Sequence, residues 1–164
     1  MDAFDAIATR RSVRKYKTTP VPRELIEKVI DAGRRAPTAM NVQPWEFVVV
    51  TDQAMRESFA EICDYGKFFS NAPVCIAVLC KETKYYLEDG CAAIENMLIA
   101  AAALELGTCW VAGDKKSYAD TIARKLNAPA KHKLVALVAL GYPADSGNPT
   151  DKRPLNQVMH IEKW

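Results

Sequence analysis

Residues 86–106, YLEDGCAAIENMLIAAAALEL, form the most apolar long stretch of this sequence. On a helix of this length the apolar residues lie nearly all round, which is typical of a helix inside a core. Its most apolar part, Cys91–Leu106, contains Glu95, Asn96 and Glu105 and falls short of the roughly 20 residues that a membrane span needs. We therefore predict a long central core helix over Tyr86–Leu106, ended by Gly107 in the usual C′ position.

Short apolar runs on both sides of this helix are typical of buried strands. The clearest is LVALVAL (134–140), a continuous run that we expect to be buried on both faces. The other predicted strands are 45–51, 74–80 and 108–111. With helices between them and no internal repeat, the pattern predicts one α+β domain over residues 1–164, with a small mixed central sheet flanked by helices on both faces.

Four shorter helices complete the predicted fold. Their starts are marked by capping or helix-breaking residues, namely Asp2, Pro22, Asp52 and Ser117. In the first helix, Phe4, Ile7 and Ala8 share one face at the spacing of an inward stripe. The second is expected to bury the stripe Leu25, Val29, Ala32 and Ala36 and to end at Pro37.

The composition excludes several classes of protein. The net charge of +2 is too balanced for a general nucleic-acid binder. Five cysteines lie in apolar runs without a CxxC pair, so we expect buried, reduced thiols. The only histidines, His132 and His160, make no recognisable zinc ligand set. The chain starts without a signal-peptide pattern, and we expect a cytoplasmic protein without a metal site.

The segment RRSVRKY, residues 10–16, has the first pattern that indicates a binding site. Arg10, Arg11 and Arg14 supply planar, permanently charged donors, and Ser12 adds a hydroxyl. Guanidinium groups pair bidentately with phosphate oxygens, so this set suits a phosphate. The alternative is a solvated basic turn whose cations complement the C-terminus of the preceding helix.

Two loops and a second basic pair add further candidates. Thr38, Asn41 and Gln43 offer donors and acceptors that match the edge of a heterocycle, although they also suit an Asx-type turn. In GTCWVAGD (107–114), Gly113 permits close approach of the backbone to a ligand, or is a plain loop glycine. The pair Lys152 and Arg153 is, taken alone, a surface charge pair.

Several familiar catalytic signatures are absent from the sequence. It has no GxGxxG after a strand, no GxxxxGK[ST] and no GxSxG, and no cysteine belongs to a known nucleophile signature. We interpret Cys109 as a buried packing residue. The sequence therefore predicts a protein that holds a cofactor and leaves the chemistry to it.

Taken together, these segments resemble the nitroreductase family of flavoproteins. Five pieces occur in family order and cover essentially the whole chain: RRSVRKY (10–16), APTAMNVQPWEFVVV (36–50), LELGTCWV (104–111), VALGYPA (138–144) and KRPLNQVMHIEKW (152–164). The resemblance implies an α+β sandwich that forms a homodimer with exchanged C-terminal segments and binds FMN at the subunit interface.

The resemblance also implies roles for particular residues. Arg10, Arg11, Ser12 and Arg14 resemble flavin contacts, the first arginines at the phosphate and Arg14 near the pyrimidine end of the ring. A cation there favours the reduced, anionic flavin. The resemblance implies three further groups of contacts. Lys152 and Arg153 resemble a second phosphate-binding pair, and Thr38, Ala39 and Asn41 resemble a loop that reaches FMN from the partner subunit. The stretch Val111–Asp114, with Ala112 and Gly113, resembles the segment that covers the flavin and bonds its N5 position.

The activity implied is that of an FMN-dependent oxidoreductase. It passes electrons from NAD(P)H to a small acceptor, such as a nitroaromatic or a quinone, by a ping-pong mechanism. Longer members carry a helical lid, but the path from Tyr65 to Tyr85 is short here, so we expect a short lid or none. The alternatives are a flavin-binding storage or regulatory protein with little turnover, and a nucleic-acid-binding module built on RRSVRK, which the nearby acids Asp2, Asp5, Glu24 and Glu27 disfavour.

Overall fold

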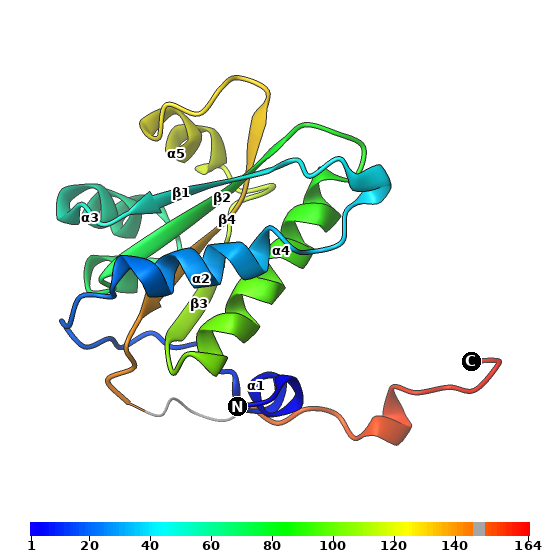
Figure 1. The fold of residues 1–164 in the computed structure, drawn as a ribbon. Coiled ribbons are helices and arrows are strands. Elements are labelled where there is room, and N and C mark those ends of the chain that lie inside the picture. The colour runs from blue at the N-terminus through cyan, green and yellow to red at the C-terminus, as the bar shows by residue number, and fades with distance from the viewer. Residues whose placement is uncertain (146–149) are drawn as a thin grey trace.

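The computed structural model describes residues 1–145 and 150–164 (Figure 1). Its central sheet has the strand order β1-β2-β4-β3, and every neighbouring pair of strands is antiparallel. The helices and strands are α1 (Ala3–Thr9), α2 (Arg23–Gly33), β1 (Trp45–Val50), α3 (Gln53–Ile62), β2 (Val74–Lys81), α4 (Tyr86–Ala103), β3 (Gly107–Ala112), α5 (Ala119–Lys125) and β4 (His132–Gly141), with single 3₁₀ turns at Ala39–Asn41, Lys67–Ser70 and Leu155–Gln157.

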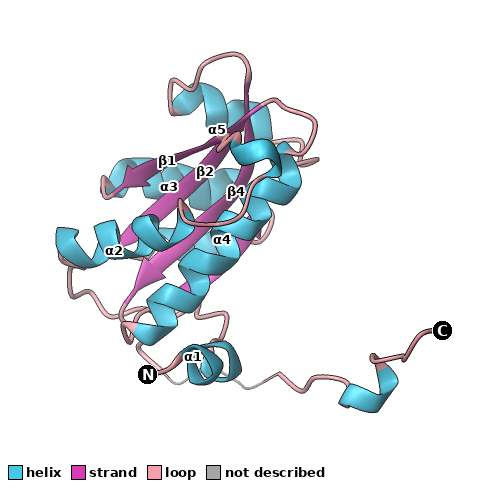
Figure 2. Cartoon of the chain, turned by 45° about the vertical axis from the view of Figure 1, so that its right-hand side comes forward, coloured by secondary structure: helices cyan, strands magenta, loops and turns pink. Residues whose placement is uncertain are grey.

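This arrangement confirms the α+β class and all four predicted strands. In place of a mixed sheet, the four strands are antiparallel throughout, and the parallel pairing found among the described residues is an isolated bridge between Ser12 and Thr108. Helices cover both faces of the sheet, as Figure 2 shows. Among the described residues, no helix combines the length and apolar character that a membrane crossing requires.

Alternation along β2 divides the core into two layers, because successive strand residues point to opposite faces. Ile76 and Val78 pack on the side of α2 and α4, where Met97 is fully buried. Cys75, Ala77 and Leu79 pack on the side of α3 and α5. The central strands β2 and β4 are therefore buried on both faces, as the run LVALVAL predicts.

Helix α4 is the predicted central helix, but it ends earlier than its sequence indicates. Its last helical residue is Ala103, and the left-handed backbone conformation falls on Glu105, with a φ of 61°. Gly107 instead begins β3. A Cβ on Gly107 would lie 2.8 Å from the Cβ of Val13, so glycine is needed there for close approach of two segments rather than for a helix cap.

The first helix does not bury its predicted face. Asp2 caps α1 as expected, accepting a hydrogen bond of 2.9 Å from the backbone N–H of Asp5. Ala6 is the residue it buries, whereas Phe4 is 85% exposed and Ile7 is 55% exposed. In α2 the buried residues are Ile26, Val29 and Gly33, so Leu25 and Ala32 lie only partly inside.

The C-terminal segment 150–164 does not pack into the core. All its residues are exposed, and it leads away from the sheet past α1 (Figure 1). Trp164 is fully exposed and Ile161 is 78% exposed. The segment 146–149, part of the predicted loop 144–153, lies outside the described residues.

Candidate functional site

Two segments that the sequence analysis singled out lie side by side at one edge of the sheet. Ser12 forms a parallel bridge with Thr108, and the N–H of Val13 donates to the carbonyl of Thr108 at 2.8 Å. Since β3 is the last strand of the sheet, the basic segment 10–14 runs along its outer edge. The folded chain thus brings the arginines of RRSVR next to the GTCWVAGD strand.

The three arginines of this segment have different surroundings. The Nε of Arg10 lies 3.4 Å from a carboxylate oxygen of Glu95 on α4, yet this buried N–H has no hydrogen-bond partner among the described residues. Arg11 donates from Nη1 to the carbonyls of Ala8 and Arg10, both at 2.8 Å, and so complements the C-terminus of α1. Arg14 is exposed and makes one long hydrogen bond of 3.3 Å to the carbonyl of Ser12.

A cleft of about 520 Å³ opens beside Arg14, with residues 109–112 of β3 in its wall. Its volume lies within the range of small-molecule and cofactor sites. The opposite walls come from residues 64–68 and from Lys116 and Tyr118. The hydroxyl of Tyr118 donates to the carbonyl of Ala112 at 2.6 Å and so fixes the end of β3. This cleft combines a strand edge, exposed cations and aromatic rings.

Cys109 lies in the wall of this cleft but is 3% exposed. Burial raises the pKa of its thiol above the ordinary value, and the opposing effect of the Arg14 cation is smaller. Cysteine acts as a nucleophile through its thiolate, so a raised pKa disfavours that role. The predicted packing role of Cys109 is confirmed by its burial.

The turn after β3 is held by a bulge in the neighbouring strand. The register between β2 and β4 passes over Val135, whose carbonyl accepts from the N–H groups of Gly113 at 3.0 Å and Asp114 at 3.1 Å. A Cβ on Gly113 would lie 2.7 Å from Leu134 Cγ. Both the N–H and the missing side chain of Gly113 therefore serve packing within the chain, whereas Ala112 is exposed and lines the cleft.

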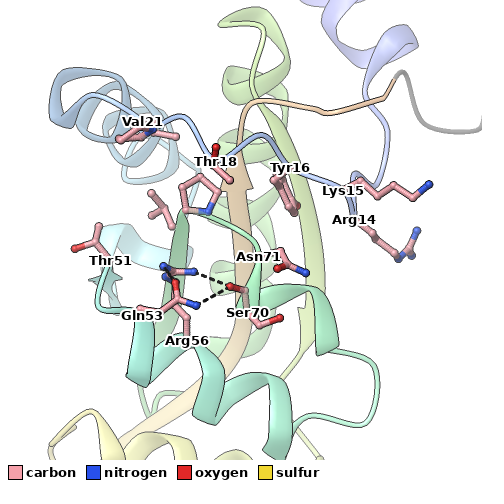
Figure 3. Close-up of a pocket in the computed structure, with 13 residues that line it drawn as sticks. Arg14, Lys15, Tyr16, Thr18, Val21, Thr51, Gln53, Arg56, Ser70 and Asn71 are labelled. Atoms are coloured by element: carbon pink, nitrogen blue, oxygen red, sulfur yellow. Dashed lines mark hydrogen bonds between the residues drawn. The ribbon is translucent and has the colours of Figure 1, made fainter.

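A larger cavity of about 700 Å³ lies near the N-terminal end of α3 (Figure 3). Arg56 is 6% exposed there and donates to the carbonyls of Phe69 and Ser70, and the Gln53 amide also donates to Ser70 at 3.0 Å. The buried Nε–H of Arg56 has no hydrogen-bond partner among the described residues. Arg14 lines this cavity as well, although Figure 3 shows its side chain directed away from Arg56 and Gln53. The smaller cleft beside β3 is the better candidate site, because it is lined both by Arg14 and by residues 109–112 of the GTCWVAGD segment.

Comparison with known proteins agrees with this geometry. Two family models match, the "Nitroreductase family" over residues 7–64 and the "Putative TM nitroreductase" model over residues 55–164. A curated protein of Methanothermobacter thermautotrophicus, named "Putative NADH dehydrogenase/NAD(P)H nitroreductase", is 36% identical over the whole chain and 88% of its own length. The chain belongs to the nitroreductase family.

Solved structures of nitroreductases have the same fold. An "FMN-dependent Nitroreductase" from Clostridium difficile superimposes with a TM-score of 0.91 at 25% identity, covering 98% of this chain and 99% of that one. A "putative nitroreductase in complex with fmn" from Desulfovibrio desulfuricans superimposes with a TM-score of 0.88 at 32% identity, covering all of this chain and 98% of that one.

The loop with Thr38, Ala39 and Asn41 does not join the arginines within one nitroreductase chain. It lies at the N-terminal end of α4, where the buried carboxylate of Asp89 accepts from the Thr38 hydroxyl at 2.8 Å and from the Ala39 N–H at 3.3 Å. Met40 and Asn41 both have a positive φ, and Met40 is 90% exposed. The loop is thus anchored at one end and projects outward at its tip. Whether it reaches a partner's site stays a prediction.

Lys152 and Arg153 lie on the exposed C-terminal segment, and neither contributes to the cleft in one chain. Conversely, the cleft contains cations that the sequence analysis missed. Lys67, on the turn after α3, and Lys116, before α5, both line it. Neither belongs to a recognisable motif, and only the fold brings them next to Arg14.

Proposed function

We propose that residues 1–164 form one FMN-binding domain of a homodimeric, FMN-dependent oxidoreductase. It passes electrons from NAD(P)H to a small acceptor such as a nitroaromatic or a quinone. The observation that carries this proposal is the pairing of the basic segment 10–14 with the edge strand β3, beside a cleft of about 520 Å³. Family membership supports the same activity.

The residues present fit FMN on chemical grounds. Arg10 keeps a buried Nε–H that lacks a hydrogen-bond partner among the described residues. It lies outside the cleft itself, two positions before Ser12, which bridges to Thr108 of β3. A phosphate accepts hydrogen bonds from such a guanidinium. Arg10, Arg11 and Ser12, with Lys152 and Arg153, would hold the phosphate, and Ala112 and Gly113 would border the ring.

When bound, FMN supplies reversible two-electron redox chemistry. The residues of the chain bind, orient and shield it. Arg14 would place a positive charge at the pyrimidine end of the ring, where Coulomb attraction stabilises added negative charge. In the net reaction, NAD(P)H gives up a hydride, which is two electrons and one proton, and one more proton from water completes the reduction of a quinone to a hydroquinone.

Exposed apolar side chains support the proposed homodimer. Phe4 on α1, Met40 on the 38–41 loop and Trp164 at the C-terminus are each at least 85% exposed. Burial of such side chains against a second copy would stabilise the association. A second copy that receives the C-terminal segment and supplies Thr38, Ala39 and Asn41 accounts for all three.

The test is the visible spectrum of the purified protein followed by steady-state kinetics. We expect bound FMN, aerobic oxidation of NAD(P)H with a quinone or a nitroaromatic, and parallel double-reciprocal lines, because the two substrates use one site in turn. Intersecting lines would contradict the ping-pong scheme. A yellow protein that NAD(P)H fails to bleach in stopped flow is instead a flavin store, and a colourless one contradicts the whole proposal.

A further inference from the structure

Two walls of the cleft are joined by an ion pair that none of the expected cofactor contacts includes. The Nζ of Lys116 lies 3.4 Å from the Oδ2 of Asp64, a residue 52 positions earlier in the chain. The same ammonium group stands 5.9 Å from the ring centroid of Tyr65, which is 80% exposed. Lys116, Asp64 and Tyr65 all line the cleft.

The charges that line this cleft are unbalanced. Arg14, Lys67 and Lys116 are cations, and Asp64 is the one carboxylate among the residues that line it. The Asp64 side chain is 56% exposed and that of Lys116 is 35% exposed, so their ion pair is screened by water and contributes little stability. A negatively charged ligand entering the cleft can therefore replace Asp64 as the partner of Lys116 at small cost.

The backbone holds Lys116 in place for this role. Its N–H donates to the carbonyl of Gly113 at 3.1 Å, which ties it to the turn that follows β3. The exposed ring of Tyr65 beside the ammonium group offers a flat surface on which an aromatic ligand can stack. The cation and the exposed ring together therefore suit an anionic ligand that carries an aromatic ring.

We infer that Lys116 is a specificity-determining residue that selects planar aromatic substrates carrying a carboxylate or a phosphate, with Asp64 as its internal competitor and Tyr65 as the stacking surface. This inference rests on the proposed function, because it places the substrate in the cleft beside β3. It predicts opposite effects for the two halves of the ion pair, which a purely structural bridge does not.

The probes are 4-nitrobenzoate and 4-nitrobenzamide, which share the ring and the nitro group and differ in charge. Lys116→Met should lower the ratio of kcat/KM for the anion over that for the amide about fivefold, through KM, since a solvent-exposed charge contact is worth about 1 kcal/mol. Asp64→Asn should raise the same ratio about twofold to threefold, because the ammonium group is released. Bound FMN should stay at the wild-type level in both variants.

Matched controls separate the local contact from net charge. Lys115→Met removes a charge at the neighbouring exposed position, and Asp120→Asn removes an acid exposed on α5; neither residue lines the cleft. Both controls should leave the ratio unchanged. Calorimetric titration with unreactive benzoate gives a second readout, in which Lys116→Met weakens binding and Asp64→Asn strengthens it.

The outcomes are distinguishable. An unchanged ratio in Lys116→Met, a fall of the ratio in both pair variants, or an equal effect of the Lys115 control would overturn the inference while leaving the oxidoreductase in place. A wild-type protein that reduces neither probe, and binds benzoate no better than benzamide, overturns this inference, and it overturns the proposed function as well only if the protein also lacks FMN or fails to reduce a quinone with NAD(P)H.

Discussion

At the scale of single residues, the sequence indicates that RRSVR is suited to bind a phosphate, but it does not indicate which groups each arginine contacts in the folded chain. Arg11 satisfies the C-terminus of α1, the alternative that a basic turn after a helix always offers. Arg10 and Arg14 keep unused donor capacity, and they differ in position: Arg10 lies against α4, and Arg14 lies at the cleft. The two therefore have separable functional predictions.

Arg10→Ala should weaken FMN binding by about 1.5–3 kcal/mol, the range for a hydrogen bond to a charged group. Fluorescence titration of the apoprotein with FMN measures this change. Arg23→Ala is a fitting control, because Arg23 forms an exposed ion pair with Glu27 on α2, outside the site. Wild-type affinity in the Arg10 variant would show that the phosphate lies elsewhere.

Arg14→Ala should reduce turnover more than it reduces FMN affinity. The guanidinium stabilises negative charge that grows during reduction, and an interaction that strengthens along the reaction affects kcat. The comparison is the rate of flavin bleaching by NAD(P)H against the Kd for FMN in the same variant. Equal losses in both quantities would show that Arg14 contributes to FMN binding only.

Cys109→Ser should leave turnover per bound FMN largely intact. The raised pKa of the buried thiol keeps it protonated near neutral pH, so no nucleophile is lost. Stability should fall by about 1–3 kcal/mol if the buried hydroxyl finds no partner, and urea denaturation measures this. An FMN-loaded but inactive Cys109→Ser protein would refute the cofactor-only mechanism.

At the scale of elements, the sequence predicts what local patterns control. The long apolar segment gives α4, and the run LVALVAL gives a doubly buried strand. Gly107 shows where local reasoning fails. A glycine after a helix usually indicates a C-terminal cap, but here it permits contact with Val13, which is far away in the sequence. The inward stripe expected of Phe4 and Ile7 is not found, because α1 lies against α4 and buries Ala6 instead.

The candidate site also combines features set by local sequence with features set by contacts between distant segments. RRSVR and the strand after α4 are continuous motifs, and both can be singled out from one sequence, as can the burial of Cys109. Lys67, Lys116 and the bulge at Val135 depend on contacts between distant segments, for which a single sequence carries no signal. The sequence therefore indicates the segments that meet at the edge of β3, but not the residues from other segments that complete the cleft beside them.

Asp89→Ala should detach the loop of Thr38 and Ala39 from α4. The buried carboxylate accepts hydrogen bonds from both residues, and losing them should cost about 2 kcal/mol in the free energy of unfolding. If the loop contributes to the partner's flavin site, FMN affinity falls as well. Glu88→Ala, at an exposed neighbouring position, is the control. Full FMN affinity in a destabilised Asp89 variant would restrict the loop to a structural role.

At the scale of the whole molecule, one chain does not bring all the proposed FMN contacts together. The arginines and the 38–41 loop lie at different places on it, and Lys152 and Arg153 lie on a segment that leaves the body of the fold (Figure 1). In a homodimer with exchanged C-terminal segments, these three groups of residues could meet at one site. Its interface should exceed about 2,000 Å², as in obligate dimers.

Deleting residues 155–164 tests this assembly directly. The segment carries Leu155, Ile161 and Trp164, exposed by 68%, 78% and 101%, and no described residue of its own chain buries them. Because burial of apolar surface stabilises association, the deletion should shift the protein toward monomer and lower its FMN content. Light scattering after size exclusion gives the mass of the truncated protein, and absorbance near the flavin band gives its FMN content. Circular dichroism checks that it still folds, which we expect because the segment does not pack into the core. A truncated protein that remains a flavin-loaded dimer would contradict the exchange of C-terminal segments. A folded, colourless monomer is the expected product, because the proposed flavin site takes residues from both copies.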